Sequence, residues 1–342
     1  MRIRWLNVFA LAAVAVAVTL VVTANSGVGK STHLLNVSYD PTREVFVELN
    51  RQFVANYERQ TGRRLIIQQS HGGSSRQARA VLAGLPADVV TLALFSDVDS
   101  LRKQGLIAEG WEKRLPNDSH PWTSTIVFVV RRGNPERIRD WPDLVRHEVS
   151  VITADPKTSG SGKLSALAAW GSVIYRGGGE REAREYMRRL FRHVPTLPAG
   201  ARGASNIFAG EKQGDVLLTW ENEAQREVAE SQGELEVVYP PVSIRAEPCV
   251  AWVDANLGSD AEAARDAHAY LEFLFTDQAQ QTIARFGYRP VNPQILAKRT
   301  KTLPKTDLFP VTILARDWDD AEQKFFAENG IFDAIYQPKA AP

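Results

Sequence analysis

The segment LIIQQSHGGSSRQARAVLAGLPADVVTLALF, residues 65–95, decides the fold, because it contains a strand, a glycine loop, a helix and a second strand in succession. Residues 65–69 favour a strand, and the loop SHGGSS (70–75) follows it. Residues 77–84 are expected to form a helix that a glycine and a proline close. The near-continuous apolar run 87–95 is typical of a strand buried on both faces of a parallel sheet. This order of elements predicts an α/β fold.

The same alternation extends along the chain on both sides of this segment. Residues 34–38 favour a strand, and an apolar residue recurs every fourth position in the amphipathic helix expected from Glu44, at Val45, Leu49, Phe53 and Tyr57. After Pro121 the pattern restarts, with strands expected at 124–130, 149–153, 215–220, 235–239 and 248–253, and helices from about 164, at 181–192 and at 261–275. Two α/β units joined by extended segments predict two lobes, with a ligand cleft at the carboxyl ends of their strands.

The composition excludes several classes of protein. At 342 residues the chain is long enough for two apolar cores, and its 44% hydrophobic and 24% charged residues are ordinary for a globular protein. A net charge of +1 gives no field that would attract nucleic acid, so we expect no nucleic-acid partner. The single cysteine, Cys249, excludes a disulfide framework, and the six histidines have no metal-binding spacing. We therefore expect no metal and no cofactor.

The N-terminus has the features of an export signal. Arg2 and Arg4 precede an uncharged, apolar stretch over residues 5–29, and Val-Thr-Ala ends at Ala24. We expect residues 1–24 to be a signal peptide and the protein to be periplasmic. The alternative is an uncleaved anchor, since about 20 apolar residues can span a bilayer, and it would leave the protein tethered to the membrane.

A motif that resembles a nucleotide-binding loop follows this stretch. Residues 24–31 read ANSGVGKS, close to the phosphate-binding pattern G-x-x-x-x-G-K-[ST]. That pattern requires a buried strand before it and a helix after it, whereas here a signal segment precedes it and a short strand follows. We therefore do not expect a nucleotide site.

Three loops rich in glycine and serine have the chemistry of an anion site. They are SHGGSS (70–75), TSGSGK (158–163) and GARGASN (200–206), and the first two precede expected helices. The first N–H groups of a helix lack intrahelical partners and carry a partial positive charge, so small residues there let an oxyanion approach the backbone. Taken singly, each loop is better explained by ordinary turn and capping chemistry. Their number and their distribution over both expected lobes favour an oxyanion site.

These segments resemble the periplasmic sulfate-binding proteins of ABC importers. The resemblance runs in order through nearly everything after the signal, over LLNVSYDPTRE (34–44), QSHGGSSRQA (69–78), DVVTLAL (88–94), KRLPNDSHPWTSTIVFVVRRGNP (113–135), VITADPKTSGSG (151–162), LAAWG (167–171), AGARG (199–203), DVLLTWENEA (215–224) and YRP (288–290).

The resemblance implies an α/β, two-lobed periplasmic binding protein fold that is type II-like. Each lobe would be a mixed sheet flanked by helices, with the ligand in the cleft between the lobes. The first lobe would be discontinuous, formed by residues 34–115 with 245–299, and residues 119–240 would form the second. Residues 300–338 would pack back on the lobes.

The resemblance also implies how the ligand is held. Backbone N–H groups would come from Asp40, Ser74, Gly160, Ser161 and Ala201, a hydroxyl from Ser159 and an indole N–H from Trp220. Ser161 replaces a glycine of the family, which affects the loop conformation but not the backbone donor. Ser75-Arg76 replaces Gly-Lys, a change that bears on the rigidity and local charge of that loop.

A pocket made only of donors favours sulfate, which at neutral pH carries only acceptors, over hydrogen phosphate, whose O–H would stay unpaired. The chain is thus expected to be a monomeric solute-binding component that delivers sulfate to a membrane permease and its ATPase. Thiosulfate is the first alternative ligand, followed by molybdate or phosphate. A serine hydrolase using Ser74 or Ser159 with His71 is a distant alternative, since no G-x-S-x-G motif is present. We expect no enzymatic activity.

Overall fold

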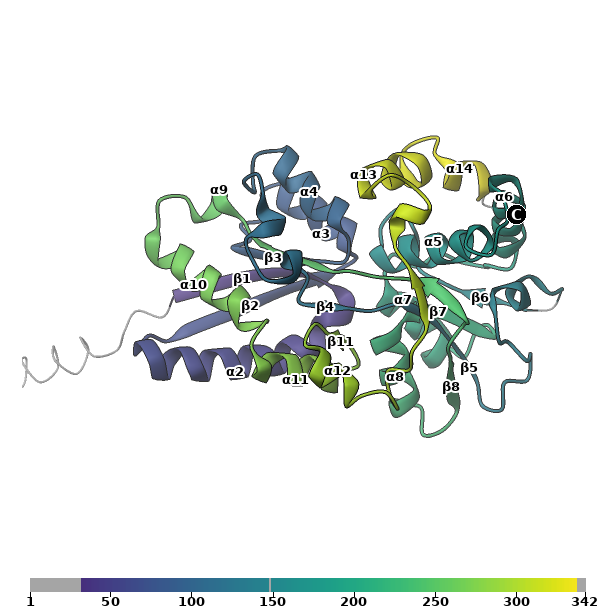
Figure 1. The fold of residues 1–342 in the computed structure, drawn as a ribbon, viewed down its shortest axis with the longest axis horizontal. Coiled ribbons are helices and arrows are strands. Elements are labelled where there is room, and N and C mark those ends of the chain that lie inside the picture. Colours follow the sequence, from purple (N-terminus) through teal and green to yellow (C-terminus); the bar gives the residue numbers. More distant parts are fainter. Residues whose placement is uncertain (1–31, 148, 337–342) are drawn as a thin grey trace, which may run out of the picture.

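The structure, a computed structural model, describes residues 32–147 and 149–336. Two lobes lie side by side, each built around a four-stranded sheet (Figure 1). The expected signal peptide at 1–24 and the loop-like motif at 24–31 lie outside the described residues. No helix among the described residues is both long enough and apolar enough to cross a membrane.

The sheet of the first lobe has the strand order β10-β3-β1-β2. Its strands are β1 (Thr32–Tyr39), β2 (Leu65–Gly72), β3 (Val89–Leu92) and β10 (Cys249–Trp252). β1 pairs in parallel with β2 and β3, whereas β10 returns from later in the chain and pairs antiparallel with β3. Val89 and Val90 point to opposite faces of β3 and are both fully buried, in two different hydrophobic clusters, because other elements cover each face of the sheet. This confirms a strand buried on both faces.

The sheet of the second lobe has the strand order β6-β7-β5-β8. Its strands are β5 (Ile126–Arg131), β6 (Val151–Ile152), β7 (Val216–Trp220) and β8 (Leu235–Val238). β6 and β7 are parallel, and β5 is antiparallel to both β7 and β8. Both sheets are therefore mixed, as expected for each lobe.

Two pairs of short strands accompany the main sheets. β4 (Trp122–Thr123) pairs with β11 (Arg289–Pro290), and β9 (Val242–Ile244) pairs with β12 (Asp307–Phe309). These strands belong to the segments along which the chain passes between the lobes, and Figure 1 shows β4 and β11 near the middle of the molecule.

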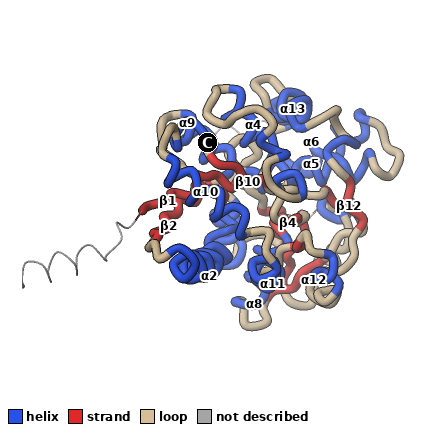
Figure 2. The backbone as a smooth tube through the Cα atoms, turned by 60° about the vertical axis from the view of Figure 1, so that its left-hand side comes forward, coloured by secondary structure: helices blue, strands red, loops and turns tan. Residues whose placement is uncertain are grey.

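Helices cover the two sheets (Figure 2). The helices from residues 40–119 and from residues 254–297, where the chain comes back to the first lobe, are η1 (Asp40–Thr42), α2 (Arg43–Thr61), α3 (Ser74–Leu82), α4 (Phe95–Lys103), η2 (Trp111–Lys113), η3 (Asn117–Ser119), α9 (Asp254–Leu257), α10 (Ala261–Phe273), α11 (Asp277–Arg285) and α12 (Pro293–Ala297). Those of the second lobe are η4 (Trp141–Val145), α5 (Gly160–Ile174), α6 (Glu180–Arg192), α7 (Ala201–Ser205), η5 (Asn206–Gly210) and α8 (Glu221–Glu230).

The predicted amphipathic stripe of α2 is confirmed. Val45, Leu49, Phe53 and Tyr57 are all buried, and the helix ends at Gly62, whose φ of 68° is left-handed. α5 is different, because it is buried nearly all round from its first residue to Ser172. A helix without a polar face forms the centre of a lobe.

The C-terminal segment contains η6 (Val311–Ile313), α13 (Trp318–Ala321), η7 (Glu322–Phe326) and α14 (Ile331–Ile335). It packs mainly on the second lobe, where Phe325 lies against Trp170 and Phe332 against Phe191. α13 lies beside α4 of the first lobe, and the ion pair Lys103–Asp319 joins them at 2.6 Å.

Several expected boundaries are wrong, and most of them lie at the glycine and serine loops. The helix expected at 77–84 begins at Ser74, the helix expected from about 164 begins at Gly160, and residues 201–205, expected in a loop, form α7. The reason is that small polar residues are tolerated in a first helical turn, where their N–H groups need no intrahelical partner. The strand expected at 87–95 ends at Leu92, and Phe95 begins α4.

Candidate functional site: a cavity lined by helix N-termini

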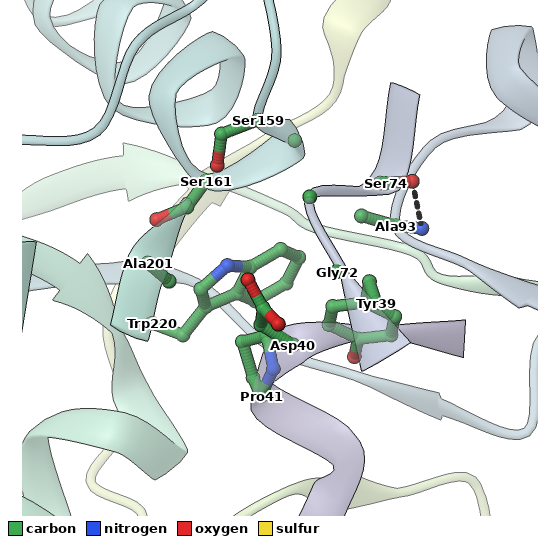
Figure 3. A pocket seen from close by; sticks show the side chains of 12 residues that line it. Tyr39, Asp40, Pro41, Gly72, Ser74, Ala93, Ser159, Ser161, Ala201 and Trp220 are labelled. Carbon is green, nitrogen blue, oxygen red and sulfur yellow. Dashed lines mark hydrogen bonds between the residues drawn. The ribbon is translucent and has the colours of Figure 1, made fainter. Parts of the chain in front are cut away.

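One cavity between the lobes brings together all seven residues that the sequence predicted for the site (Figure 3). It is lined by Tyr39, Asp40, Pro41, Gly72, Gly73, Ser74, Ala93, Ser159, Gly160, Ser161, Ala201 and Trp220. Its empty volume is about 170 Å³, compared with 850 and 940 Å³ for two other cavities of the molecule. It is therefore several times smaller than those two cavities and suits a small ligand.

The residues that line the cavity lie where strands end and helices begin. Asp40 is the first residue of η1, Ser74 of α3, Gly160 of α5 and Ala201 of α7, and Trp220 directly precedes α8. Both lobes contribute such helix starts. The carboxyl ends of strands are where open α/β sheets bind ligands, and helix N-termini favour negative charge.

Five backbone N–H groups at these helix starts are available to a ligand. The N–H groups of Asp40, Ser74, Gly160, Ser161 and Ala201 donate to no acceptor among residues 32–147 and 149–336. Buried backbone N–H groups in proteins are nearly always paired. A set of five unpaired N–H groups around one cavity therefore indicates an acceptor-rich ligand.

Two side chains add further unpaired donors to the same cavity. The indole N–H of Trp220 and the hydroxyl of Ser161 are buried and have no partner in the described part of the chain. The hydroxyl oxygen of Ser159 accepts the N–H of Gly162 at 3.4 Å, which leaves its own O–H free to donate. The Ser161 hydroxyl is a donor beyond the backbone role expected for this residue.

The hydroxyl of Ser74 is used inside the protein. It donates to Asp97 at 2.5 Å and accepts the N–H of Ala93 at 2.9 Å, so only the backbone of Ser74 is left for the cavity. His71 lies elsewhere, with its Nδ1 at 2.8 Å from the hydroxyl of Ser38. The Ser74–His71 pair that a hydrolase would use is therefore not formed.

Three basic side chains near the cavity are paired with carboxylates. Arg43 donates to the carboxylate of Asp40 at 3.0 Å, and Lys163 pairs with Glu322 at 2.7 Å. Arg202, next to Ala201, pairs with Glu44 of α2 at 3.0 Å. Burial, with the nearby Arg43 guanidinium, lowers the pKa of His71 to about 4, so this ring is neutral at neutral pH. The donors that line the cavity are uncharged groups.

Three glycines let the lobes approach one another around the cavity. A Cβ at Gly73 would lie 2.5 Å from the backbone oxygen of Thr158, and a Cβ at Gly160 would lie 2.6 Å from Ala93. A Cβ at Gly200 would lie 2.5 Å from Oδ2 of Asp40, so this carboxylate is turned toward the loop of the other lobe. Each of these contacts joins one lobe to the other.

The sequence did not single out five residues that line the cavity. Gly72 and Gly73 lie in the glycine loop, where their composition was a signal, but Tyr39, Pro41 and Ala93 are of types that usually serve packing or turns.

Comparison with known proteins identifies the family. Residues 42–289 match the family model described as bacterial extracellular solute-binding protein. A thiosulfate-binding protein of Pseudomonas aeruginosa is 46% identical to the chain, over 89% of this chain and 92% of the relative. A sulfate-binding protein of Escherichia coli K12 is 43% identical, over 94% of this chain and 98% of the relative.

A solved structure agrees with these relatives. The sulfate-binding protein SubI from Mycobacterium tuberculosis H37Rv has a TM-score of 0.78 and 30% identity, over 86% of this chain and 99% of SubI. The chain belongs to the bacterial extracellular solute-binding proteins, in the group that includes sulfate-binding and thiosulfate-binding proteins.

Proposed function

We propose that this chain is the solute-binding component of a sulfate ABC importer, and that it holds sulfate on Asp40, Ser74, Ser159, Gly160, Ser161, Ala201 and Trp220. The observation that carries the proposal is the set of unpaired, uncharged donors around one small cavity. The names of the relatives from Escherichia coli and Mycobacterium tuberculosis point to the same ligand.

The donor set explains how sulfate would be selected. Sulfate offers only acceptor oxygens, and each can take N–H or O–H groups from the cavity. Hydrogen phosphate carries a proton that would face donors, and an unmet buried polar group costs about 1–3 kcal/mol. The carboxylate of Asp40 is the charged acceptor among the groups that line the cavity, and it is held by Arg43 and turned toward Gly200.

The same donors account for the affinity without a charged residue. A hydrogen bond to a charged group contributes about 1.5–3 kcal/mol. The five backbone N–H groups, the Ser159 hydroxyl and the Trp220 indole together exceed the roughly 8 kcal/mol of a micromolar complex. The surplus offsets the ordering of side chains and the closure of the lobes.

Thiosulfate is the second candidate ligand. A relative at 46% identity is a thiosulfate-binding protein. Thiosulfate presents nearly the same array of acceptors, so the donors described here would serve both ions.

We further propose that the protein is exported to the periplasm, works as a monomer and delivers its ligand to a membrane permease and its ATPase. Ligand would shift the population of open and closed forms through a hinge. The proposed lobes are residues 34–115 with 245–299 and residues 119–240, which is supported by the sharing of one sheet by β1, β2, β3 and β10. The C-terminal segment 300–338 would pack on both.

Calorimetric titration with sulfate, thiosulfate, molybdate and phosphate, at about pH 6 and about pH 8, tests the proposal. We expect tight binding of sulfate and thiosulfate, and phosphate binding weaker by at least about tenfold. Tight binding of phosphate, or no binding of sulfate, contradicts the proposal. Turnover of an ester substrate would favour the hydrolase instead.

A further inference from the structure

A buried ion pair involves Glu221, the residue that directly follows the indole donor Trp220 in the chain. The guanidinium of Arg289 holds the carboxylate of Glu221 through two hydrogen bonds, Nε to Oε2 at 2.7 Å and Nη2 to Oε1 at 2.8 Å. The side chain of Glu221 is 0% exposed and that of Arg289 is 9% exposed. Arg289 also donates to the backbone oxygen of Pro304 at 2.8 Å.

The two partners belong to two of the segments that carry the family resemblance. Glu221 belongs to WENEA and is the first residue of α8, and Arg289 belongs to YRP and lies in β11. Neither side chain lines the cavity. Glu221 follows Trp220 directly in the chain, so its carboxylate is a fixed negative charge beside a residue that lines the anion cavity.

Few groups can counter that charge. Burial raises the pKa of Glu221, and Arg289 opposes the rise. Besides Arg289, the titratable side chain that faces Glu221 is Tyr239, which follows β8. Burial raises the pKa of Tyr239, so it stays neutral. Arg289 is thus the group that balances this carboxylate.

We propose that Arg289 is a positioning residue for anion binding, which acts by cancelling the charge of the buried Glu221 carboxylate, next to Trp220 in the chain. This inference rests on the proposed function. An unpaired buried carboxylate would repel the anion through a medium of low dielectric, so the pair keeps the cavity accessible to a dianion. Arginine suits the task because its planar fork binds both carboxylate oxygens and stays charged.

The proposal predicts that removing Arg289 and removing Glu221 have different effects on sulfate affinity. In R289Q the carboxylate loses its partner, and we expect sulfate affinity at about pH 8 to fall at least about tenfold. Because burial then favours protonation of Glu221, the loss should shrink as the pH falls toward about 6. E221Q removes the negative charge and leaves a cation, so it should bind sulfate at least as tightly as the unmodified protein. The double variant R289Q/E221Q should recover affinity to within about threefold.

The test is calorimetric titration of the full chain and these variants with sulfate between about pH 6 and about pH 9, with thermal unfolding as a check of folding. The exposed pair Arg181–Glu182 supplies matched controls, R181Q and E182Q, which should not change affinity. Equal, pH-independent losses in R289Q and E221Q would overturn the inference and indicate packing alone. If R289Q does not fold, a loss of more than about tenfold in E221Q overturns it equally. Failure of the unmodified protein to bind sulfate would instead reject the proposed function.

Discussion

Trp220 shows how a single residue decides what the site can bind. Its indole N–H is buried without a partner in the described residues, and its ring lies against Tyr39 of the other lobe with centroids 5.2 Å apart. The ring therefore contributes packing between the lobes, and the N–H contributes a donor. A substitution by a smaller aromatic residue removes the donor and retains part of the packing.

We expect Trp220→Phe to weaken sulfate binding by about 1.5–3 kcal/mol, a loss of about tenfold or more, because one hydrogen bond to a charged ligand is removed. Calorimetric titration measures it. Trp111→Phe is the matched control, since the Trp111 indole is also buried and without a partner among the described residues but lies outside the cavity. Equal affinities for the Trp220 variant and the unmodified protein would exclude the indole as a donor.

His71 gives the protein a pH dependence of stability. Its pKa is about 4 in the folded protein, against 6.5 ordinarily, because burial and Arg43 disfavour the charged ring. Between these values the unfolded chain binds a proton that the folded protein does not, so stability falls as the pH falls from about 6.5 to about 4. His71→Gln should lose less stability over this range than the unmodified protein.

Thermal unfolding at about pH 7 and about pH 4.5 checks this expectation. His33→Gln, at an exposed histidine of β1, is the control for the substitution itself. Identical pH profiles for the His71 variant and the unmodified protein would contradict the assignment.

At the scale of elements, the residue types of the loops predicted the site better than its secondary structure. Glycine and serine disfavour helix interiors, so residues 74–76, 160–163 and 201–205 read as loops, whereas each forms a first helical turn. The first N–H groups of a helix have no intrahelical acceptor, so at these positions they are available to a ligand in the cavity. The sequence predicted the hydrogen-bond donors from the residue types of the loops, but the helix boundaries depend on the tertiary structure.

We expect Gly73→Ala to prevent the lobes from closing, because the new Cβ would meet the backbone oxygens of Thr158 and Ala199 at 2.5 and 2.9 Å. Backbone atoms cannot yield as a flexible side chain can. Sulfate affinity should fall by more than about tenfold, whereas the stability of the ligand-free protein should stay within about 1 kcal/mol.

Small-angle scattering with and without sulfate, combined with titration, separates closure from folding for this variant. Gly210→Ala is the control, since a Cβ there would meet no atom within 4 Å. Normal compaction and normal affinity in the Gly73 variant would show that closure tolerates the extra carbon.

At the scale of the whole molecule, the lobes are joined by charges as well as by close contacts. Arg202 of α7 pairs with Glu44 of α2 at 3.0 Å, so this pair links the second lobe to the first. We expect Glu44→Gln to weaken sulfate binding by about two- to fivefold at low salt, because it removes a contact of the closed form, and by less at high salt.

Titration at two salt concentrations checks this pair, with Glu58→Gln on the exposed face of the same helix as the control. A loss that is independent of salt, or equal in the two variants, would contradict an electrostatic link between the lobes.

Sequence alone could not predict contacts of this kind. Glu221 and Arg289 lie 68 positions apart, and Lys163 and Glu322 lie 159 apart, with no pattern that marks them as partners. The α/β alternation and seven of the residues that line the cavity follow from local patterns and from the family resemblance. The pairing of distant charges follows only from how the lobes and the C-terminal segment pack.

The central claim is that uncharged donors alone hold a fully ionised anion, and proton exchange on binding tests it most directly. Calorimetric titration of sulfate at about pH 7, in two buffers with different ionisation enthalpies, measures the protons taken up or released. We expect the same binding heat in both buffers, since no group of the site or the ligand changes its protonation. Heats that differ in proportion to the buffer enthalpies would show that a titrating group takes part in binding, and would contradict the account.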